Sequence, residues 1–556
     1  MDTKSILKIS FLLVILGLFL FIPNLGLVHL FDWDEINFAE AAREMLVTGD
    51  YLNVRIDFEP FHEKPPLFIW LQAVSMHIFG VSEFAARLPN ALIGIITIQV
   101  LFYMGRKLYD VKFGLIWVMA FVGSLLPHFY FKTAIIDPTF NLLIYLSIYF
   151  LFKISKNELE KSEIKALDLF FAGLFCSLGM LTKGPVAYLL IVLTWAGVFF
   201  IYRKQAKFPI KKLLLLTLYS SILPLIWYSL LIMQSGSGLV EDFVAYHIRL
   251  LTTGDAGHSG PIYYHFVILL LGCFPASVLI FRSFRKQSDD SHSQNLFKIW
   301  NFVLLAVVLI IFSIVKTKIV HYSSLAYFPI TFLAAYSVYS IVYREIGWKW
   351  TTTVMITLIG IVYSALFILF PLALINVEMI LPKITDEMTY EVLSSPVHWG
   401  GFEYIVGIIF FIGLCISLVL VFMRKYLPSF VALTATIAVT ITLFLPLVAP
   451  KIEQYTQAAP IEFFGYLAQD DVYLHTLGYK SYVPYYYGEK KYERSRYYLG
   501  MSGKEYEQFL LEGDIQSDAY FSAKMTAADN FANQYPELIE LYRKNGFVFF
   551  KRERIQ

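Results

Sequence analysis

The sequence predicts a polytopic α-helical membrane protein with a small α/β domain at its C-terminal end. The composition is the first indication, because 57% of the 556 residues are hydrophobic and only 16% are charged, whereas soluble domains carry about 25% charged residues. Apolar runs of about 18 residues or more, the length that crosses a bilayer, recur along most of the chain. After residue 448 these runs give way to short alternating and periodic segments that are typical of a soluble domain.

We expect thirteen membrane-spanning helices. The predicted ranges are 9–31, 84–105, 113–131, 138–152, 167–184, 185–202, 213–233, 262–281, 297–315, 320–343, 350–372, 403–423 and 428–448. The first run is too long for the core of a signal peptide and no clear cleavage site follows it, so we expect this helix to be retained. Together these helices predict a membrane domain over residues 1–448.

Basic residues in alternate loops predict the orientation of the chain. They begin with Lys4 and Lys8 before the first helix, and they recur after the second, fourth, sixth, eighth, tenth and twelfth helices. Lysine and arginine are enriched in cytoplasmic loops, so we expect a cytoplasmic N-terminus. An odd number of spans then places the C-terminus outside. The net charge of +2 argues against a nucleic-acid partner.

Four larger segments are expected on the outer side, namely 32–83, 234–261, 373–402 and the tail 449–556. The first two are loops of the membrane domain, whereas the tail is the predicted α/β domain. Within the tail, residues 471–479, 481–492, 518–525 and 546–553 are predicted strands. Residues 503–513 and 528–546 are predicted helices that end at glycine.

The first outer loop opens with the acidic stretch "FDWDEINFAE". Residues 34–48 have an apolar face and a charged face, which predicts an amphipathic helix that ends at Gly49 and lies along the membrane surface. Asp32 and Glu35 have the spacing of a capping box. For Asp34 the sequence leaves two interpretations open, a helix-capping carboxylate or a catalytic one.

The same loop continues with "FHEKPPLFIW", residues 61–70. The double proline predicts an extended turn, after which apolar residues return towards the bilayer. Glu63 and Lys64 are therefore expected at the level of the lipid headgroups. A lysine at that depth suits a phosphate ligand, although a lysine that extends to the interface and pairs with its neighbouring glutamate is an alternative.

Further charged residues lie at the predicted outer ends of helices. Asp137 precedes a proline, which also fits a plain helix cap. Two short turns are expected on the outer side, against the positive-inside trend. They contain Lys183 in "LTKGP", and Lys316, Lys318, His321 and Tyr322 in "KTKIVHYSSLAYFP". Several outward cations together predict an anionic ligand at the membrane surface.

The second outer loop contributes histidines and an arginine. Glu63 together with a histidine of this loop has the ligand types that hold a divalent metal ion such as zinc, although the sequence has no HExxH motif and no paired-cysteine site. The residues concerned are His247 and His258 as alternative metal ligands and Arg249 as a further cation.

In chain order, the motifs "DEINFAEAAREMLVTGDY", "EKPPL", "IDPTF", "LTKGP" and "KTKIVHYSSLAYFP" resemble those of the GT-C class of membrane glycosyltransferases. The resemblance is greatest to the bacterial aminoarabinose transferases that modify lipid A, within the protein mannosyltransferase superfamily. It covers about residues 1–450. The tail is similar in placement and size but shares no motif.

This resemblance implies an inverting glycosyltransferase in the bacterial inner membrane with its tail in the periplasm. Such an enzyme takes a sugar from a polyprenyl-phosphate carrier, such as undecaprenyl phosphate, and passes it to lipid A or another glycolipid. The implied catalytic residues are Asp34, Asp137 and Glu35. The implied carrier-phosphate ligands are Lys64, Arg249, Tyr322 and Lys183. Glu63 and His247 match a metal-binding pair of some relatives, for Zn or Mg, with His258 as a rival ligand.

The chain departs from the aminoarabinose transferases in one motif. They usually have Asp-Glu-Thr-Arg-Tyr-Ala-Glu, and here Asn37 stands in place of the arginine, which leaves the sugar and the acceptor open. A protein acceptor is one alternative. A flippase or transporter of lipid-linked sugars is another, but it would show repeat symmetry and polar groups at the bilayer midplane. A third alternative is a structural scaffold protein with a binding domain on its outer side. The tyrosine-rich segment of the tail suits either sugar stacking or anchoring at the interface.

Overall fold

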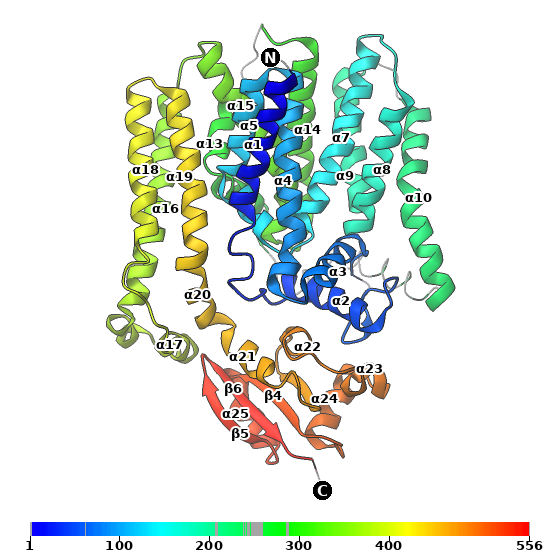
Figure 1. The fold of residues 1–556 in the computed structure, drawn as a ribbon, viewed down its shortest axis with the longest axis vertical. Helices are drawn as coiled ribbons and strands as arrows, with labels where there is room; N and C mark the ends of the chain where they lie inside the picture. The colour runs from blue at the N-terminus through cyan, green and yellow to red at the C-terminus, as the bar shows by residue number, and fades with distance from the viewer. Residues whose placement is uncertain are drawn as a thin grey trace.

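The computed structural model describes residues 3–61, 63–205, 209–236, 260–284 and 289–554, together with residues 238, 241 and 245. Long helices form one region, and a small domain with a sheet lies below one end of them (Figure 1). The N-terminal helix begins at the opposite end of the helical region from the sheet domain. The predicted class, a polytopic helical membrane protein with a small α/β C-terminal domain, is confirmed.

The long helices share an apolar composition and run roughly along one direction (Figure 1). They are α1 (Thr3–Phe21), α4 (Glu83–Leu108), α5 (Val111–Val122), α7 (Asp137–Leu159), α8 (Ala166–Lys183), α9 (Val186–Tyr202), α10 (Ile210–Ser235), α14 (His292–Ile314), α15 (Tyr327–Tyr343), α16 (Trp350–Ile375), α18 (Ile405–Phe422) and α19 (Tyr426–Leu447). The apolar helix α12 (Tyr264–Gly272) is shorter.

The predicted number of spans is too high by the criteria of length and composition. In the described part of the chain ten helices are long and apolar enough to cross a membrane, or twelve if each of two bent pairs counts as one span. α5 and the segment Leu125–Lys132 are bent by 84°, and α12 and the segment Ala276–Arg282 by 105°. The remaining predicted span is α9, whose 17 residues extend about 26 Å at 1.5 Å per residue, slightly less than a hydrocarbon core of about 30 Å.

Burial divides the helices into a centre and a periphery. In the apolar windows of α7 and of the segment Val320–Tyr343, which includes α15, 78% and 89% of the residues are buried. The corresponding share is only 22% for α16 and 28% for α10, which leaves most of their side chains for contact with lipid. α7 and α15 therefore lie at the centre of the helical region and α10 and α16 at its periphery.

Several short elements lie between the helical region and the C-terminal domain (Figure 1). They are α2 (Asp34–Thr48), the hairpin of β1 (Arg55–Ile56) and β2 (Glu59–Pro60), and α3 (Leu67–Phe79). The 3-10 helix η4 (Val320–Ala326) directly precedes α15. α2 ends at Gly49, as predicted, in the left-handed conformation that favours glycine (φ 71°). The prediction of a surface-lying amphipathic α2 is wrong, because every side chain from Glu35 to Met45 is buried.

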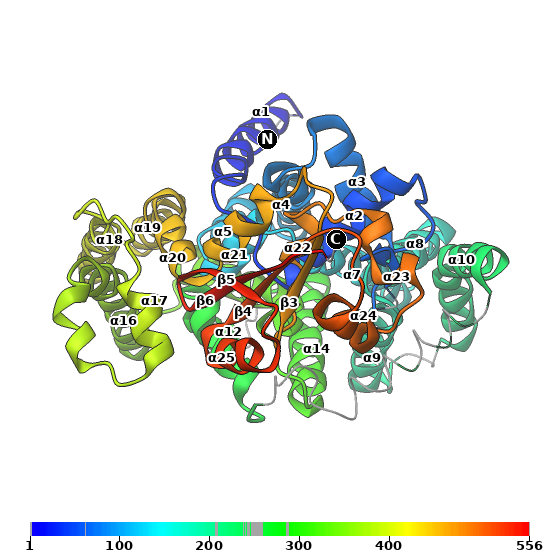
Figure 2. The ribbon, with the colours of Figure 1, turned by 90° about the horizontal axis from the view of Figure 1, so that it is seen from below.

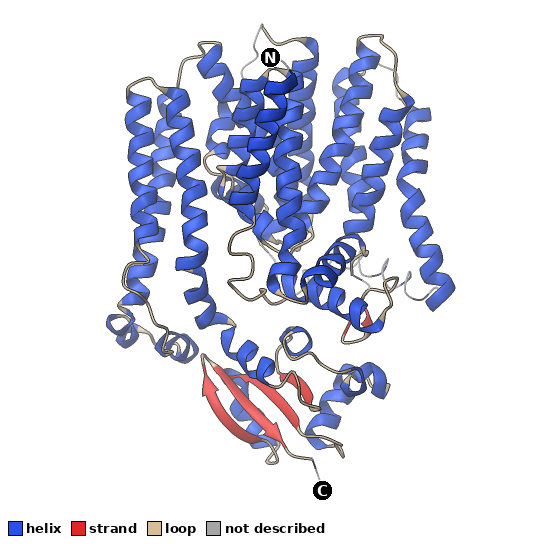
Figure 3. Ribbon diagram, in the orientation of Figure 1, coloured by secondary structure: helices blue, strands red, loops and turns tan. Residues whose placement is uncertain are grey.

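The C-terminal domain begins directly after α19. α20 (Ala449–Thr456) and α21 (Ala458–Tyr466) lead into a four-stranded sheet of order β3-β4-β6-β5 (Figure 3). β3 (Tyr473–Leu477) pairs in parallel with β4 (Ala519–Lys524), and the pairs β4–β6 and β6–β5 are antiparallel. Seen from below, this domain lies across the middle of the helical region, with α16, α18 and α19 to one side (Figure 2).

Two predicted elements of the tail have a different structure. The segment 481–492 contains the helical turn α22 (Val483–Tyr486) instead of a strand, and Pro484 stands in its first turn, where a proline is favoured. The predicted helix 528–546 is split into α25 (Met525–Gln534) and strand β5 (Ile539–Lys544). Pro536 lies between them and cannot continue a helix. The predicted helix 503–513 is confirmed as α24 (Gly503–Glu512), and β6 (Phe547–Arg552) lies in a predicted strand.

Candidate active site

A tight turn presents Asp34 at the start of α2. Trp33 has φ 77° and ψ −76°, and the Asp34 N–H donates to the Asp32 carbonyl over 3.3 Å. This is a three-residue γ-turn with positive φ, which is rare and strained for a bulky residue. The Asp32 carboxylate accepts from the Trp33 and Tyr482 N–H groups, each at 2.9 Å. The predicted capping box is therefore wrong, because Asp32 connects the first loop to the C-terminal domain.

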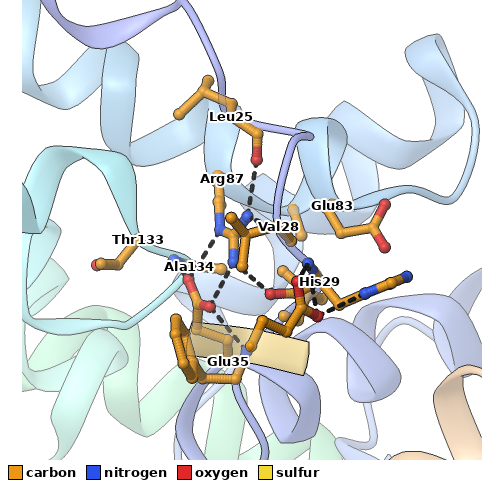
Figure 4. Close-up of polar contacts among 12 residues, drawn as sticks. Leu25, Val28, His29, Glu35, Glu83, Arg87, Thr133 and Ala134 are labelled. Atoms are coloured by element: carbon orange, nitrogen blue, oxygen red, sulfur yellow. Dashed lines mark hydrogen bonds and ion pairs between the residues drawn. The ribbon is translucent and has the colours of Figure 1, made fainter. Parts of the chain in front are cut away.

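Glu35 lies in a buried hydrogen-bond network (Figure 4). Its carboxylate pairs with the Arg87 guanidinium through two bonds of 3.0 and 2.7 Å. It also accepts from the Phe31 N–H at 2.9 Å and the Ala134 N–H at 2.6 Å. Arg87 in turn donates to three carbonyls of the chain segment after α1, those of Leu25, Val28 and His29. Both Glu35 oxygens are thus engaged in fixing the loop, and this geometry suits a positioning residue.

The other carboxylates of α2 are also engaged in protein contacts. Glu40 binds Arg43 through two bonds of 2.7 Å, and Glu44 accepts from the Phe58 N–H at 3.0 Å. Burial, together with the nearby Glu40, raises the pKa of Glu44 well above its ordinary value. Among the α2 carboxylates, Asp34 is the one that reaches solvent, with a side chain that is 52% exposed.

Asp34 lies close to a group of charged residues and to His321. Its Oδ2 lies 3.8 Å from Nδ1 of His321 on η4. Asp137, Lys183 and Lys64 all lie close enough to His321 to act on its charge. The structure therefore brings four predicted site residues together and adds His321. The sequence indicates His321 only through its position next to Tyr322 in the same turn.

Lys64 lies at the centre of this group. Its Nζ is 3.9 Å from the Glu63 carboxylate. Burial lowers the pKa of Lys64 below its ordinary value and the neighbouring Lys183 lowers it further, whereas Glu63, Asp34 and Asp137 raise it. A buried ammonium close to a second cation is stabilised by any anion that binds between them.

Asp137 and Lys183 form a close pair. Lys183 Nζ donates to Asp137 Oδ1 over 2.6 Å, and both side chains are largely buried. The Lys183 ammonium also lies 5.2 Å from the centre of the Tyr322 ring. The alternative of a plain helix cap is wrong for Asp137, because the N-cap position of α7 is Ile136 and no side-chain cap bond forms there in the described structure. Asp137 therefore positions Lys183 beside Tyr322.

Some outer cations have structural partners. Lys318 Nζ donates to three carbonyls at the end of α14, those of Phe312, Ser313 and Val315, and thus caps that helix. Lys132 likewise donates to the Pro23 carbonyl after α1. The backbone carbonyls account for the positions of these two lysines. The evidence for an anion site therefore comes from Lys64 and Lys183.

The predicted metal site cannot be followed in full, because His247, His258 and the phosphate ligand Arg249 lie outside the described residues. Glu63 lies inside them and contacts Lys64. Among the described residues no group of three or more His, Cys, Asp or Glu side chains is arranged to hold a metal ion.

The sequence is similar to that of known glycosyltransferases. The profile of the family described as dolichyl-phosphate-mannose-protein mannosyltransferase matches residues 63–228. The undecaprenyl phosphate-alpha-4-amino-4-deoxy-L-arabinose arabinosyl transferase of Wigglesworthia glossinidia brevipalpis is 26% identical over 343 residues, covering 60% of this chain and 59% of that protein. The protein of the same name from Pectobacterium carotovorum is 26% identical over 337 residues, covering 59% and 58%. The matches thus span less than two thirds of these relatives.

Two solved structures share the fold over nearly the whole chain. The crystal structure of ArnT from Cupriavidus metallidurans bound to undecaprenyl phosphate has a TM-score of 0.75 at 16% identity, covering 99% of this chain and 98% of that chain. The apo structure of the same protein has a TM-score of 0.76 at 15% identity, covering 98% of each. The resemblance to the GT-C class of membrane glycosyltransferases is confirmed. Within that class, the fold is the one seen in ArnT.

Proposed function

We propose that this protein is an inverting glycosyltransferase that moves a sugar from a polyprenyl-phosphate carrier to lipid A or another glycolipid. The reaction takes place on the outer face of the bacterial inner membrane, with the N-terminus in the cytoplasm and the C-terminal domain in the periplasm. The named activity of the relatives and the ArnT fold support this proposal. The sugar in the names of those relatives, 4-amino-4-deoxy-L-arabinose, is the first donor to test.

The observation that carries the proposal is the proximity of two largely buried cations to one half-exposed carboxylate. Lys64 and Lys183 lie at the outer helix ends, where the phosphate of a lipid carrier is located, and Asp34 lies beside them. The leaving group is a phosphate monoester whose negative charge grows as the bond to the sugar breaks. Cations fixed beside that position stabilise the transition state more than the ground state and so lower the barrier.

The reaction is a single displacement at C1 of the sugar. An acceptor oxygen forms the new bond to C1 while the bond between C1 and the carrier phosphate breaks, so the anomeric centre is inverted. Polyprenyl phosphate leaves with the bonding electron pair. Asp34 takes the acceptor's proton or orients the acceptor oxygen, which as general-base catalysis contributes about 10²–10⁴-fold. His321, 3.8 Å from Asp34, orients that carboxylate.

The proposal also includes a divalent metal ion. Glu63 with His247 or His258 would hold Zn or Mg, since carboxylate and imidazole are ordinary ligands of zinc and carboxylate of magnesium. A bound dication would supply further positive charge near the carrier phosphate. Metal content of the purified protein, before and after treatment with a chelator, tests this part: a stoichiometric ion that Glu63→Gln removes supports it, and a metal-free active protein contradicts it.

Transfer by the purified protein in lipid nanodiscs tests the proposed function. Undecaprenyl-phosphate-linked sugars are offered with lipid A, other glycolipids and peptides, and the products are identified by mass spectrometry. We expect transfer to a glycolipid that Lys64→Ala abolishes. Lys504→Ala, at an exposed position of α24, is the matched control and is expected to retain it. Transfer to peptides would identify a protein glycosyltransferase, and movement of intact donor between leaflets without transfer would identify a flippase.

A further inference from the structure

A groove lies between α4 and α7, away from the active site. Both helices begin near the C-terminal domain and end at the opposite end of the helical region (Figure 1). The groove extends from about the middle of these helices towards that opposite end. Its volume is about 350 Å³, within the range of about 300–1,000 Å³ that is usual for ligand sites. Its walls are formed by Val100, Tyr103 and Met104 of α4 and by Leu146, Tyr149 and Phe150 of α7.

The lining of this groove suits a hydrocarbon chain. Its surface is almost entirely apolar. Gln99 also lines it, but the Gln99 amide Nε2 donates to the Ser10 carbonyl of α1 over 3.0 Å and is thus engaged with a neighbouring helix. A sugar or an ion would have to leave its hydration shell for apolar walls, which is costly. An acyl chain of a lipid has no such cost.

Each wall of the groove ends in a cation that is held over an aromatic ring. On α4, the Arg106 guanidinium lies 5.4 Å from the centre of the Tyr103 ring. On α7, the Lys153 Nζ lies 4.8 Å from the centre of the Phe150 ring. Both cations come one helical turn after their aromatic residue, on the side away from the C-terminal domain. Lys153 is also paired with Asp168 of α8, so its charge is offset.

The charge of Arg106 is not offset in this way. Within the described part of the chain Arg106 forms no ion pair, and its buried Nε has no hydrogen-bond partner. The carboxylate nearest to it in the sequence, Asp110, instead accepts from the Phe113 N–H and the Tyr339 hydroxyl, each at 2.8 Å. Lys107 follows in the same last turn of α4 and is exposed. The rim of the groove therefore carries positive charge that suits an anion.

The distance between this rim and the groove matches one leaflet of a bilayer. Along α4, Gln99 lies about 10 Å from Arg106 at 1.5 Å per residue, which is less than the roughly 15 Å of half a hydrocarbon core. Along α7, the groove begins about 14 Å from Asp137 and the proposed carrier-phosphate site. A lipid whose phosphate contacts Arg106 thus reaches the groove from the leaflet opposite the active site.

We propose that this groove binds an acyl chain of an anionic phospholipid from the leaflet opposite the C-terminal domain, with the lipid headgroup at Arg106 and Lys107. Basic pockets between membrane helices are a recognised form of anionic-lipid site. The bound lipid contacts α4, which carries Arg87, and α7, which carries Asp137, and so stabilises the packing of the two helices. This inference goes beyond the proposed function, because the lipid takes no part in sugar transfer.

Native mass spectrometry of the delipidated protein in detergent tests the proposal without donor or acceptor. Phosphatidylglycerol and phosphatidylcholine with identical acyl chains are added in turn. We expect wild type to retain one phosphatidylglycerol in preference to phosphatidylcholine. Arg106→Gln is expected to weaken phosphatidylglycerol binding at least fivefold, since a cation near a lipid surface contributes about 1 kcal/mol. Val100→Trp, which fills the groove without changing its charge, is expected to weaken it as well.

Arg203→Gln is the matched control. Arg203 follows α9 at the same end of the helical region, and its guanidinium likewise lies over an aromatic ring, 4.2 Å from the centre of Phe200. It does not line the groove, so this change is expected to leave lipid binding within about twofold of wild type, well short of the loss expected for a cation that contacts the lipid.

Three results would overturn the proposal. Equal retention of both phospholipids by wild type would show general lipid contact, and equal losses in Arg106→Gln and Arg203→Gln would show an effect of overall surface charge. Displacement of phosphatidylglycerol by equimolar undecaprenyl phosphate would assign the groove to the carrier chain. Arg106→Gln alters a half-buried side chain at a helix end, so the comparison stands even if Val100→Trp does not fold.

Discussion

Asp34 and Glu35 are neighbours with opposite environments. Glu35 is 2% exposed, and both its oxygens are occupied by Arg87 and by backbone N–H groups. The Asp34 side chain is half exposed and faces His321. The sequence identified both carboxylates as candidates but could not separate their roles, because Arg87 and Ala134 approach Glu35 from segments 52 and 99 residues away.

The protonation of Lys64 is expected to limit activity at high pH. Burial lowers the pKa of Lys64 from its ordinary value of 10.5, so the ammonium that binds the carrier phosphate is lost as pH rises through this lowered pKa. As the pH is raised, we expect kcat/KM for the donor to begin to fall before pH 10.5 is reached. In Lys64→Arg the side chain stays protonated, so the falling limb should move to higher pH. The pH profiles of the two proteins check this, and identical profiles would count against a role for Lys64.

Two residues near Asp34 could not have been found by motif alone. The sequence distinguishes Asn37 only as a departure from the usual arginine. Tyr482 is one of many tyrosines in the tail. Their proximity arises from the contact between α2 and α22, which are distant in the chain. His321 is easier to predict, because it adjoins Tyr322 in a turn whose cations already indicate an anion site.

At the scale of elements, the start of α2 depends on its attachment to α4. The strained turn at Trp33 needs fixed surroundings, and the pairing of Glu35 with Arg87 of α4 supplies them (Figure 4). The sequence predicted the helix and its end at Gly49, because periodicity and a glycine stop are local signals. It could not predict that both faces of α2 are buried, because the covering residues of α22 lie in the tail.

Arg87→Ala is expected to destabilise the protein strongly. The change leaves the buried Glu35 charge without its cation and removes the donor to three carbonyls, and breaking a buried ion pair from one side costs about 3–5 kcal/mol. Thermal unfolding in detergent measures the effect. Arg543→Ala is a suitable control, because Arg543 pairs with Glu540 and Asp529 on the surface, where such pairs contribute about 1 kcal/mol or less. Equal effects of both changes would contradict a structural role for the Arg87 pair.

At the scale of the whole molecule, the C-terminal domain forms part of the site instead of a separate appendage. His29 pairs with Glu453 of α20 at 2.5 Å, Gln457 binds the Leu30 carbonyl, and Asp32 holds Tyr482. The sequence predicted the class of fold, most spans and the strands β3, β4 and β6, because each is encoded in local hydrophobic patterns. Docking of the tail onto the first loop depends on contacts over more than 400 residues, which no local pattern encodes.

The contact between His29 and Glu453 is expected to make the attachment of the tail depend on pH. The hydrogen bond that the His29 ring donates to the Glu453 carboxylate raises the pKa of His29 above 6.5. The stabilisation is therefore complete below about pH 6.5 and is lost as pH rises through the raised pKa. Since His29 is partly exposed, we expect a change of about 1 kcal/mol or less. Proteolysis of the tail, followed from pH 5 to 9, should show this loss in wild type and little change in Glu453→Gln.

The central claim is that Asp34 serves the chemistry of sugar transfer at an outer-face site that holds the carrier phosphate. A single-turnover measurement with pre-bound undecaprenyl-phosphate-linked sugar tests it most directly, in wild type and Asp34→Asn. We predict that donor affinity stays within about threefold while the rate of transfer falls by about 10²–10⁴-fold, the range of general-base catalysis. Transfer by Asp34→Asn at the wild-type rate would contradict the claim and remove Asp34 from the reaction.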